Sequence, residues 1–367
     1  MSNCIIAQSG GPTSVINSSV VGLIHANKEL MAFDKVYGGL NGIEGILNKN
    51  IIDLSSKSDE EINAFRFTPS SGLGSCRYKL KDAETCADEY KKLINILNEY
   101  DIKAFFYIGG NDSMDTTAKL AQYAKENNID IKFIGIPKTI DNDLKYIDHT
   151  PGFGSAAKFI ATTTLETSLD ASVYINNGIF ILETMGRDTG WLAASACIAK
   201  LDGKPVADFI YLPEVAFDKY KFLIDVKKRF EENNKVYIIV SEGIRDKDGK
   251  FISEFECVSQ DKFGHTQLGG VSNYLRNIIL DSGITTRVKA LELGILQRCA
   301  MHCASDTDLE EAYMVGEMAL RYAYEGESGK MVTIQRENNN PYKVSYSLVD
   351  ADKIAHNVRY VPAEWIN

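Results

Sequence analysis

Short apolar segments alternate with helical patterns from the first residues of the chain. The segment CIIAQSGG, which begins at Cys4, is rich in apolar residues and ends in a glycine pair, so it predicts a buried strand and a tight turn. Residues 14–30 then place apolar side chains at the spacing of an amphipathic helix. The alternation continues with a helix over 81–100, a strand over 103–110, a helix over 111–127 and a strand over 132–140.

The second half of the chain repeats this pattern. It predicts helices over 154–172, 188–200 and 218–233, and strands over 178–186, 208–214 and 235–243. Strands that are apolar throughout are typical of parallel sheets covered by helices on both faces. We therefore expect an α/β fold with two Rossmann-like, doubly wound domains and mainly parallel sheets. The length of 367 residues also favours two domains.

Composition and charge narrow the possible functions. The formal net charge of −10 argues against a protein that binds nucleic acid or an anionic membrane, because both require a basic surface. It leaves room for an anionic small substrate held by a local cluster of cations. The 7 scattered cysteines suggest reduced thiols rather than a disulfide framework. The N-terminus does not resemble a signal peptide, and we expect a cytoplasmic protein.

Two glycine pairs end predicted strands, where ligands of open α/β sheets bind. Gly10 and Gly11 lack a Cβ, so backbone N–H groups could approach a phosphate, although a plain strand-to-helix turn explains the pair equally well. In YIGGNDSMD the glycines precede Asn111 and Asp112, either of which could cap the next helix. A carboxylate beside a phosphate site indicates instead a Mg²⁺ site or the exclusion of some ligand.

The segment PKTIDND follows another predicted strand. Asp141 and Asp143 are two positions apart, so that one can act as a base while the other faces Mg²⁺. The alternative is an Asx turn with solvated acids, in which Lys138 is a structural counter-ion.

Three further polar residues lie near strand ends. Arg187 in ETMGRDTGW suits bidentate binding of a phosphate or carboxylate, and Glu242 in IIVSEG is placed to accept hydrogen bonds from sugar hydroxyls. Arg298 in GILQRC ends an apolar run. For Arg187 and Glu242 the alternative is a surface ion pair, and such pairs are common.

The order of the motifs GGP, GGND, PKTIDND, PGFGSAAKFI, ETMGRDTGWLA, SEG and LQR resembles the 6-phosphofructokinase family from about Cys4 to Leu320. PKTIDND and the aspartate of GGND resemble its pyrophosphate-dependent branch. The resemblance implies reversible, Mg²⁺-dependent phosphoryl transfer from pyrophosphate to the 1-hydroxyl of fructose 6-phosphate, which gives fructose 1,6-bisphosphate and phosphate.

The resemblance also implies a domain plan. Residues 1–152 plus about 297–341 would form the phosphoryl-donor domain, and 153–296 plus about 342–367 the sugar-phosphate domain, with the active site in the cleft between them. Sites shared at subunit interfaces in this family imply a homo-oligomer, either a dimer or a tetramer.

Roles for the chemical centre follow from the matched motifs. Asp141 would be the base that takes the proton from the sugar 1-hydroxyl, with Thr139 beside it. Gly11 and Arg77 would face the transferred phosphoryl group. Asp143 would bind Mg²⁺.

Roles for the sugar side follow in the same way. Met185, Gly186, Arg187 and Glu242 would hold the sugar, and Arg187 also counts among the catalytic residues. Arg298 would bind the 6-phosphate. Lys289 aligns with an arginine that reaches a neighbouring subunit's site, or Arg287 does if a two-residue insertion is allowed.

Asp112 and Lys138 would select the phosphoryl donor, and Asp112 is a second expected Mg²⁺ ligand. ATP-dependent members of the family usually have glycine at both positions. An aspartate in the path of a nucleotide's inner phosphate costs space and repulsion, whereas a lysine offers a cation to compact pyrophosphate.

The chain departs from the family pattern in several places. Asn111 stands where aspartate is usual, and Ile295 where many members have His or Tyr. Gly178 stands where an arginine often reaches the sugar phosphate of a neighbouring subunit. Asn111 affects an expected contact between a carboxylate and the metal. Ile295 and Gly178 affect the expected sugar site shared between subunits, and Asp141 and its neighbours are intact.

Three alternatives remain open from the sequence. The chain could be an ATP-dependent kinase of the same fold, with Lys138 pairing Asp112. It could be a subunit without catalysis that binds sugar phosphate and regulates a partner. A seven-carbon ketose phosphate could also serve as acceptor, because it has the same 1-hydroxyl and terminal phosphate.

Overall fold

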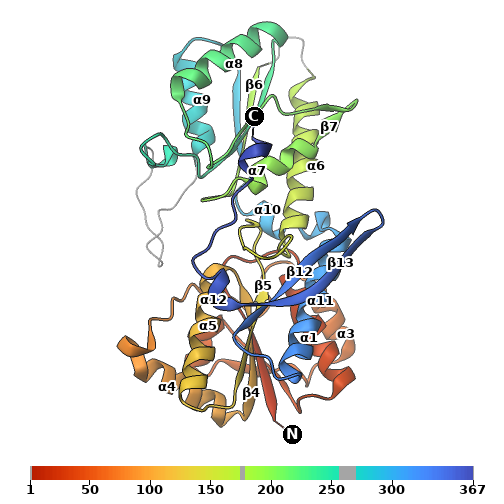
Figure 1. Ribbon diagram of the computed structural model, residues 1–367. Coiled ribbons are helices and arrows are strands. Elements are labelled where there is room, and N and C mark those ends of the chain that lie inside the picture. Colours follow the sequence, from red (N-terminus) through yellow and green to blue (C-terminus); the bar gives the residue numbers. More distant parts are fainter. Residues whose placement is uncertain (1, 174–177, 256–269, 367) are drawn as a thin grey trace. The chain divides into compact units, whose positions relative to one another are not determined.

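The structure is a computed structural model that describes residues 2–173, 178–255 and 270–366 (Figure 1). The chain divides into two compact units. The first unit comprises Met1–Ile140, Leu144–Ser155 and Ala304–Val358. The second comprises Asp141–Asp143, Ala156–Cys303 and Arg359–Asn367. In the described parts of the chain, no helix is long and apolar enough to cross a membrane.

The first unit is built on a seven-stranded sheet with the strand order β13-β12-β5-β4-β1-β2-β3. Its inner strands pair in parallel, and only the outer pairs β2–β3 and β12–β13 are antiparallel. The strands are β1 (Asn3–Gln8), β2 (Val36–Gly39), β3 (Ile51–Asp53), β4 (Ile102–Gly109), β5 (Lys132–Pro137), β12 (Lys330–Asn339) and β13 (Tyr342–Asp350).

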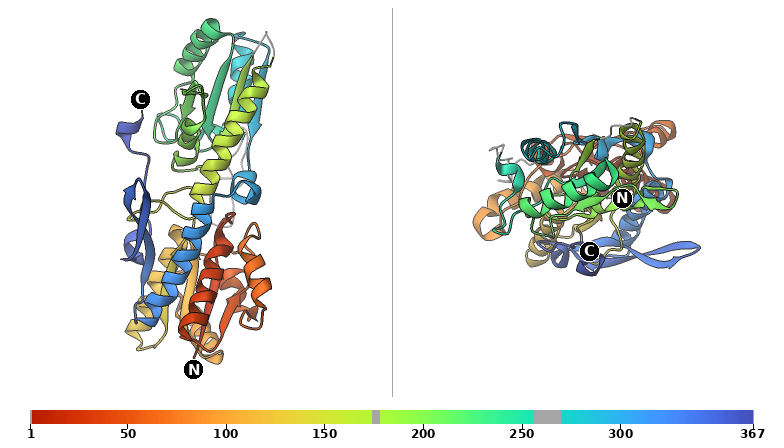
Figure 2. Two further views of the ribbon diagram at one scale, coloured as in Figure 1. Left: turned by 90° about the vertical axis from the view of Figure 1, so that its right-hand side faces the viewer. Right: turned by 90° about the horizontal axis from the view of Figure 1, so that it is seen from above.

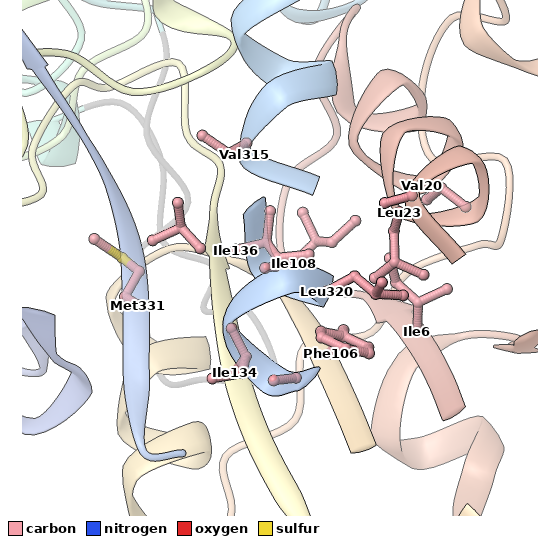
Figure 3. Close-up of a cluster of buried hydrophobic side chains, with 14 of the residues drawn as sticks. Ile6, Val20, Leu23, Phe106, Ile108, Ile134, Ile136, Val315, Leu320 and Met331 are labelled. Atoms are coloured by element: carbon pink, nitrogen blue, oxygen red, sulfur yellow. The ribbon is translucent and has the colours of Figure 1, made fainter. Parts of the chain in front are cut away.

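Helices cover both faces of this sheet. One face packs against α1 (Ile16–Leu30), α3 (Asp59–Arg66) and α11 (Asp306–Tyr324), and the other against α2 (Gly42–Leu47), α4 (Ala83–Glu99) and α5 (Asn111–Glu126), with α12 (Ala351–Ile354) beside α5 (Figure 1). Neighbouring residues of one strand enter different cores: Ile6 and Phe106 face α1 and α11 (Figure 3), whereas Ile5 and Phe105 face α4. Burial on both faces explains why these strands are apolar throughout.

The second unit has a four-stranded, fully parallel sheet with the order β11-β6-β10-β9. Its strands are β6 (Ile179–Thr184), β9 (Phe209–Tyr211), β10 (Val236–Ser241) and β11 (Val288–Glu292), and β7 (Lys200–Leu201) pairs with β8 (Lys204–Pro205) separately. Its α-helices are α6 (Phe153–Ala171, in this unit from Ala156), α7 (Trp191–Ser195), α8 (Lys219–Asn233), α9 (Val271–Asp281) and α10 (Leu296–Cys299). Short 3₁₀ turns are η1 (Ala196–Ile198), η2 (Ile252–Phe255), η3 (Met301–Cys303) and η4 (Ala363–Trp365).

The expected fold class, two Rossmann-like units with mainly parallel sheets, is confirmed, but two details differ. The sequence-based division placed residues 342–367 with the second domain and 297–303 with the first. Residues up to Val358 lie in the first unit, because β13 pairs along its length with β12, and residues up to Cys303 lie in the second. The single helix expected over 188–200 is α7 followed by the turn η1.

Helices α1 and α11 approach each other through glycines. A Cβ added to Gly22 would lie 2.0 Å from the carbonyl oxygen of Tyr313, and one added to Gly316 would lie 1.9 Å from that of Ser19. Figure 2 shows the two helices side by side. The backbones touch directly, so a side chain at either position requires the helices to separate.

This contact makes a prediction about stability. Gly316→Ala should lower the free energy of unfolding of the first unit by about 1–3 kcal/mol, because the methyl group overfills a backbone–backbone contact. The measurement is the urea midpoint followed by circular dichroism. Lys28→Ala, an exposed change on α1, is the control and should shift stability by no more than about 0.5 kcal/mol. Equal stability of Gly316→Ala and the parent would show that the helices adjust without cost.

Candidate functional site

In the first unit, the loop after β1 lies against the loop that contains Arg77. Gly10 N donates to the Cys76 carbonyl at 3.1 Å, and Ser75 Oγ donates to the Gly10 carbonyl at 2.6 Å. Gly10 has a φ of 76°, a left-handed conformation that favours glycine. The structure thus brings the backbone near Gly11 and Arg77 together from positions far apart in the sequence.

Lys138 links the ends of three strands in this unit. Its backbone N donates to the Gly109 carbonyl at 3.0 Å after β4, and its Nζ donates to the Gly11 carbonyl at 2.6 Å after β1. The residue is only 4% exposed, so the ammonium group is held at the glycine loop rather than in solvent. An added Cβ at Gly10 would lie 3.2 Å from Nζ, which shows how closely the amine approaches this loop.

Asp112 lies in the first turn of α5, whose N-cap is Gly110 without a side-chain hydrogen bond. The expectation that Asn111 or Asp112 caps this helix is therefore wrong. The helix begins close to the strand end: a Cβ added to Gly109 would lie 1.9 Å from Ser113 Oγ. The exposed Asp112 carboxylate is placed at the positive end of the helix, which favours an anion.

In the second unit, the loop Asp141–Asp143 is held by its backbone. Thr189 Oγ1 donates to the Asp141 carbonyl at 3.1 Å, and Arg359 N donates to the Asp143 carbonyl at 2.7 Å. Asn142 is buried with a φ of 56°, in the left-handed region. The flanking Asp141 and Asp143 are partly exposed, so the loop presents two acids from a fixed backbone.

The loops after β6 and β10 lie next to each other because these strands pair in parallel register. Ser241 Oγ donates to the Gly186 carbonyl at 2.5 Å, and Gly186 N donates to Glu242 Oε1 at 3.3 Å. A Cβ added to Gly243 would lie 2.0 Å from the Arg187 carbonyl oxygen. The three predicted sugar-site residues Gly186, Arg187 and Glu242 are thereby brought together.

The surroundings of Glu242 change its acidity. Burial, followed by the negative charges of Asp141 and Glu183, raises the pKa of Glu242 to about 7, against the opposing effects of the Gly186 amide and Arg187. A carboxyl group with this pKa changes charge close to neutral pH.

Arg298 and Met185 are connected through the helix α10. Gln297, which precedes Arg298 on α10, accepts a hydrogen bond from Met185 N at 3.2 Å through Oε1. The helix that presents Arg298 is therefore fixed to the loop after β6. Lys289 lies on β11 with Nζ 3.8 Å from Asp170, in an exposed pair.

Gly178 is a structural requirement of this chain. A Cβ at this position would lie 2.3 Å from the Arg287 carbonyl oxygen and 2.9 Å from the Arg287 Cβ. No larger residue fits without backbone movement. The absence of an arginine at position 178 is thus built into the packing of β6 against the segment before β11.

Several residues that shape these loops were not singled out from the sequence. Thr189 and Gln297 lie inside the motifs ETMGRDTGWLA and LQR, so their positions were a usable signal. Arg359 lies in the tail, far from every motif, and no local pattern indicated its contact with the loop Asp141–Asp143.

A partly buried ionic network fixes the loop that precedes α6 in the first unit. His149 Nδ1 lies 2.7 Å from Asp148 Oδ2, and His149 Nε2 lies 2.6 Å from Glu311 Oε2 on α11. Arg336 on β12 also pairs with Asp148 at 2.8 Å, and the Tyr342 hydroxyl donates to Glu311. Burial opposes a charge on His149, but the hydrogen bonds and charges of Asp148 and Glu311 outweigh it and raise the pKa of His149 to about 9.

The raised pKa predicts how stability depends on pH. Because the folded pKa of about 9 exceeds the unfolded value of 6.5, the stabilisation is fully present below pH 6.5 and is lost as the pH rises through 9. The advantage of the parent over His149→Gln should therefore shrink by about 3 kcal/mol between pH 6 and 10. Urea unfolding at several pH values measures it.

The control is His356→Gln, which replaces an exposed imidazole of the same unit and should leave the curve of stability against pH close to the parent's. If the parent and His149→Gln lose stability in parallel over this range, the imidazolium is not held by Asp148 and Glu311.

The fold and the polar loops at the ends of its parallel strands define a doubly wound α/β protein. Its residues 3–320 match the family model described as Phosphofructokinase, and the chain belongs to this family.

Named relatives agree with this assignment. The chain is 41% identical over 367 residues to a pyrophosphate–fructose 6-phosphate 1-phosphotransferase of Halomonas elongata, covering 99% of this chain and 87% of the relative. It is 39% identical over 368 residues to the protein of the same name from Methylococcus capsulatus, with coverage of 100% and 87%. The crystal structure of a pyrophosphate-dependent phosphofructokinase from Nitrosospira multiformis is similar with a TM-score of 0.89 and 36% identity, covering 100% of this chain and 87% of that one.

Proposed function

We propose that this protein transfers a phosphoryl group reversibly from pyrophosphate to the 1-hydroxyl of fructose 6-phosphate. The observation that supports pyrophosphate as donor most directly is the buried Lys138, whose Nζ lies 2.6 Å from the Gly11 carbonyl at the strand-end glycine loop. The cation is held where a phosphate-binding turn is expected, and Asp112 adds a carboxylate at the start of α5. This combination favours a compact anion and disfavours a nucleotide.

The loop Asp141–Asp143 supplies the proposed proton acceptor. Asp141 takes the proton of the sugar 1-hydroxyl as that oxygen attacks phosphorus, and the P–O bond to the leaving phosphate breaks. Thr189 fixes the Asp141 carbonyl, so that the carboxylate starts from a defined backbone. Thr139, whose carbonyl accepts from Thr150 Oγ1 at 2.8 Å, belongs to the same segment.

The sugar phosphate is bound by the second unit's loops in this proposal. Met185, Gly186 and Glu242 contact the sugar, and Arg187 neutralises negative charge on the substrate. Arg298 binds the 6-phosphate. Lys289 and Arg287 are candidates to reach a neighbouring subunit of a homo-oligomer, since both are exposed.

The available donors suit Mg²⁺. No group of three or more His, Cys, Asp or Glu side chains is arranged to hold a metal ion within the described ranges. Mg²⁺ typically binds one or two protein carboxylates and completes its octahedron with water and substrate phosphates. Asp112 and Asp143 are the proposed ligands, and the ion would neutralise charge on the phosphates.

A comparison of donors tests the proposal. With Mg²⁺ and fructose 6-phosphate, kcat/KM for pyrophosphate should exceed that for ATP, and Asp112→Gly combined with Lys138→Gly should shift the ratio towards ATP by at least about tenfold. Formation of fructose 1,6-bisphosphate is the readout. Asp141→Asn is the control and should lose turnover with both donors. Efficient use of ATP by the parent, with pyrophosphate ignored, would falsify the proposed donor.

The acidity of Glu242 gives a second test. A carboxylate accepts hydrogen bonds from sugar hydroxyls better than a neutral acid does, so kcat/KM for fructose 6-phosphate should fall as the pH drops below about 7, approaching tenfold per pH unit. Glu242→Gln should lose this limb of the profile, and Glu242→Asp should retain one. A weaker fall in kcat/KM that remains in Glu242→Gln at low pH reports the protonation of the substrate's own phosphate. Superimposable profiles for the parent and Glu242→Gln would exclude Glu242 as the titrating group.

A further inference from the structure

The end of the chain lies beyond residues 3–320, the range matched by the family model, and yet it contacts the loop Asp141–Asp143. Arg359 donates from its backbone N to the Asp143 carbonyl at 2.7 Å. Its guanidinium donates to the Asn142 carbonyl from Nε at 3.1 Å and from Nη2 at 2.9 Å. One residue of the tail therefore donates to two successive carbonyls of the loop.

A tryptophan holds the guanidinium of Arg359 in place. The Arg359 guanidinium carbon lies 5.1 Å from the centre of the Trp191 ring, a cation–π distance, and Trp191 Nε1 donates to the Arg359 carbonyl at 2.9 Å. Trp191 is the first residue of α7, directly after the segment that contains Arg187 and Thr189. Arg359 thus connects the acidic loop to the loop after β6.

Glu214 provides an independent anchor for the same tail. Its Oε1 accepts from Gly190 N at 2.9 Å and from Val361 N at 3.0 Å. A Cβ at Gly190 would lie 2.7 Å from Glu214 Oε2, so the contact is close. The position of the tail at residues 359–361 is therefore set by its neighbours as well as by Arg359 itself.

The backbone geometry of the loop Asp141–Asp143 matters because Asp141 is the proposed base. Asn142 has a left-handed φ of 56°, and its carbonyl needs a donor once it is buried. The planar guanidinium gives two N–H groups to this oxygen, which a lysine amine cannot reproduce. A displacement of a reacting group by about 1 Å can cost on the order of 100-fold in rate.

We propose that Arg359 is a positioning residue of the phosphotransferase site: it fixes the backbone of the loop Asp141–Asp143 and thereby orients the Asp141 carboxylate. This inference rests on the proposed function, in which Asp141 is the base. Under this proposal the tail contributes to turnover. The alternative is that the tail contributes only to the stability of the second unit.

Kinetics of Arg359→Ala test the proposal. We expect kcat to fall by about 10- to 100-fold while KM for fructose 6-phosphate changes by less than about threefold, since the contact is to the loop and not to the sugar. Guanidinium chloride at low millimolar, non-denaturing concentration should restore part of kcat in Arg359→Ala and not raise it in the parent. Arg359→Lys should lie close to Arg359→Ala, because charge without the planar fork does not replace the two donors.

Trp365→Ala is the matched control in the tail. Trp365 makes an edge contact with Trp191, with ring centroids 5.9 Å apart, and is 67% exposed. Its loss should leave kcat within about twofold of the parent, because Arg359 keeps its contacts. An equal loss of kcat in both variants, without rescue by guanidinium, would show that the tail acts only through general stability and would overturn the proposal.

Hydrogen exchange separates this inference from the proposed function. Amides of the segment 139–146 should exchange faster in Arg359→Ala than in the parent, whereas those of β10 should not. If the parent has no pyrophosphate-dependent turnover, the proposed function fails, and the exchange result still shows whether Arg359 holds the loop. Unchanged exchange in 139–146 together with unchanged kcat would refute the role of Arg359.

Discussion

The carbonyl groups of loops that leave a parallel sheet are no longer paired within that sheet, and in each unit a cationic side chain donates to one such carbonyl. Lys138 Nζ donates to Gly11 in the first unit, and the guanidinium of Arg359 donates to Asn142 in the second. Buried carbonyls without donors would be costly, so these contacts fix the loops to the rest of their unit. Each cation acts on the backbone as well as through its charge.

Close backbone contact is the second constraint, and glycine makes it possible. Gly243 lets the loop after β10 lie against the Arg187 carbonyl, and Gly316 lets α11 lie against α1. Gly178 belongs to the same group, because the Arg287 carbonyl fills the space that a side chain would need. A departure from the family pattern at this position thus has a packing cause within the chain.

Two carboxyl groups, one in each unit, have pKa values shifted in opposite directions. Burial, followed by the negative charges of Asp141 and Glu183, disfavours the charged form of Glu242 and raises its pKa. Asp148 accepts hydrogen bonds from His149 and Arg336, so its charged form is favoured and its pKa falls to about 2. Burial raises the pKa in both cases, and it prevails at Glu242, whereas the hydrogen bonds and positive charges of His149 and Arg336 outweigh it at Asp148.

The sequence alone determined the α/β class, the parallel strands and most helices, because the periodicity of apolar residues is a local property. It also placed Lys138, Asp141, Arg187 and Glu242 at strand ends. Only the tertiary structure decided that β13 completes the first sheet, that Glu242 has a raised pKa and that Arg359 holds the acidic loop. These depend on contacts between residues far apart in the chain, which no local pattern specifies.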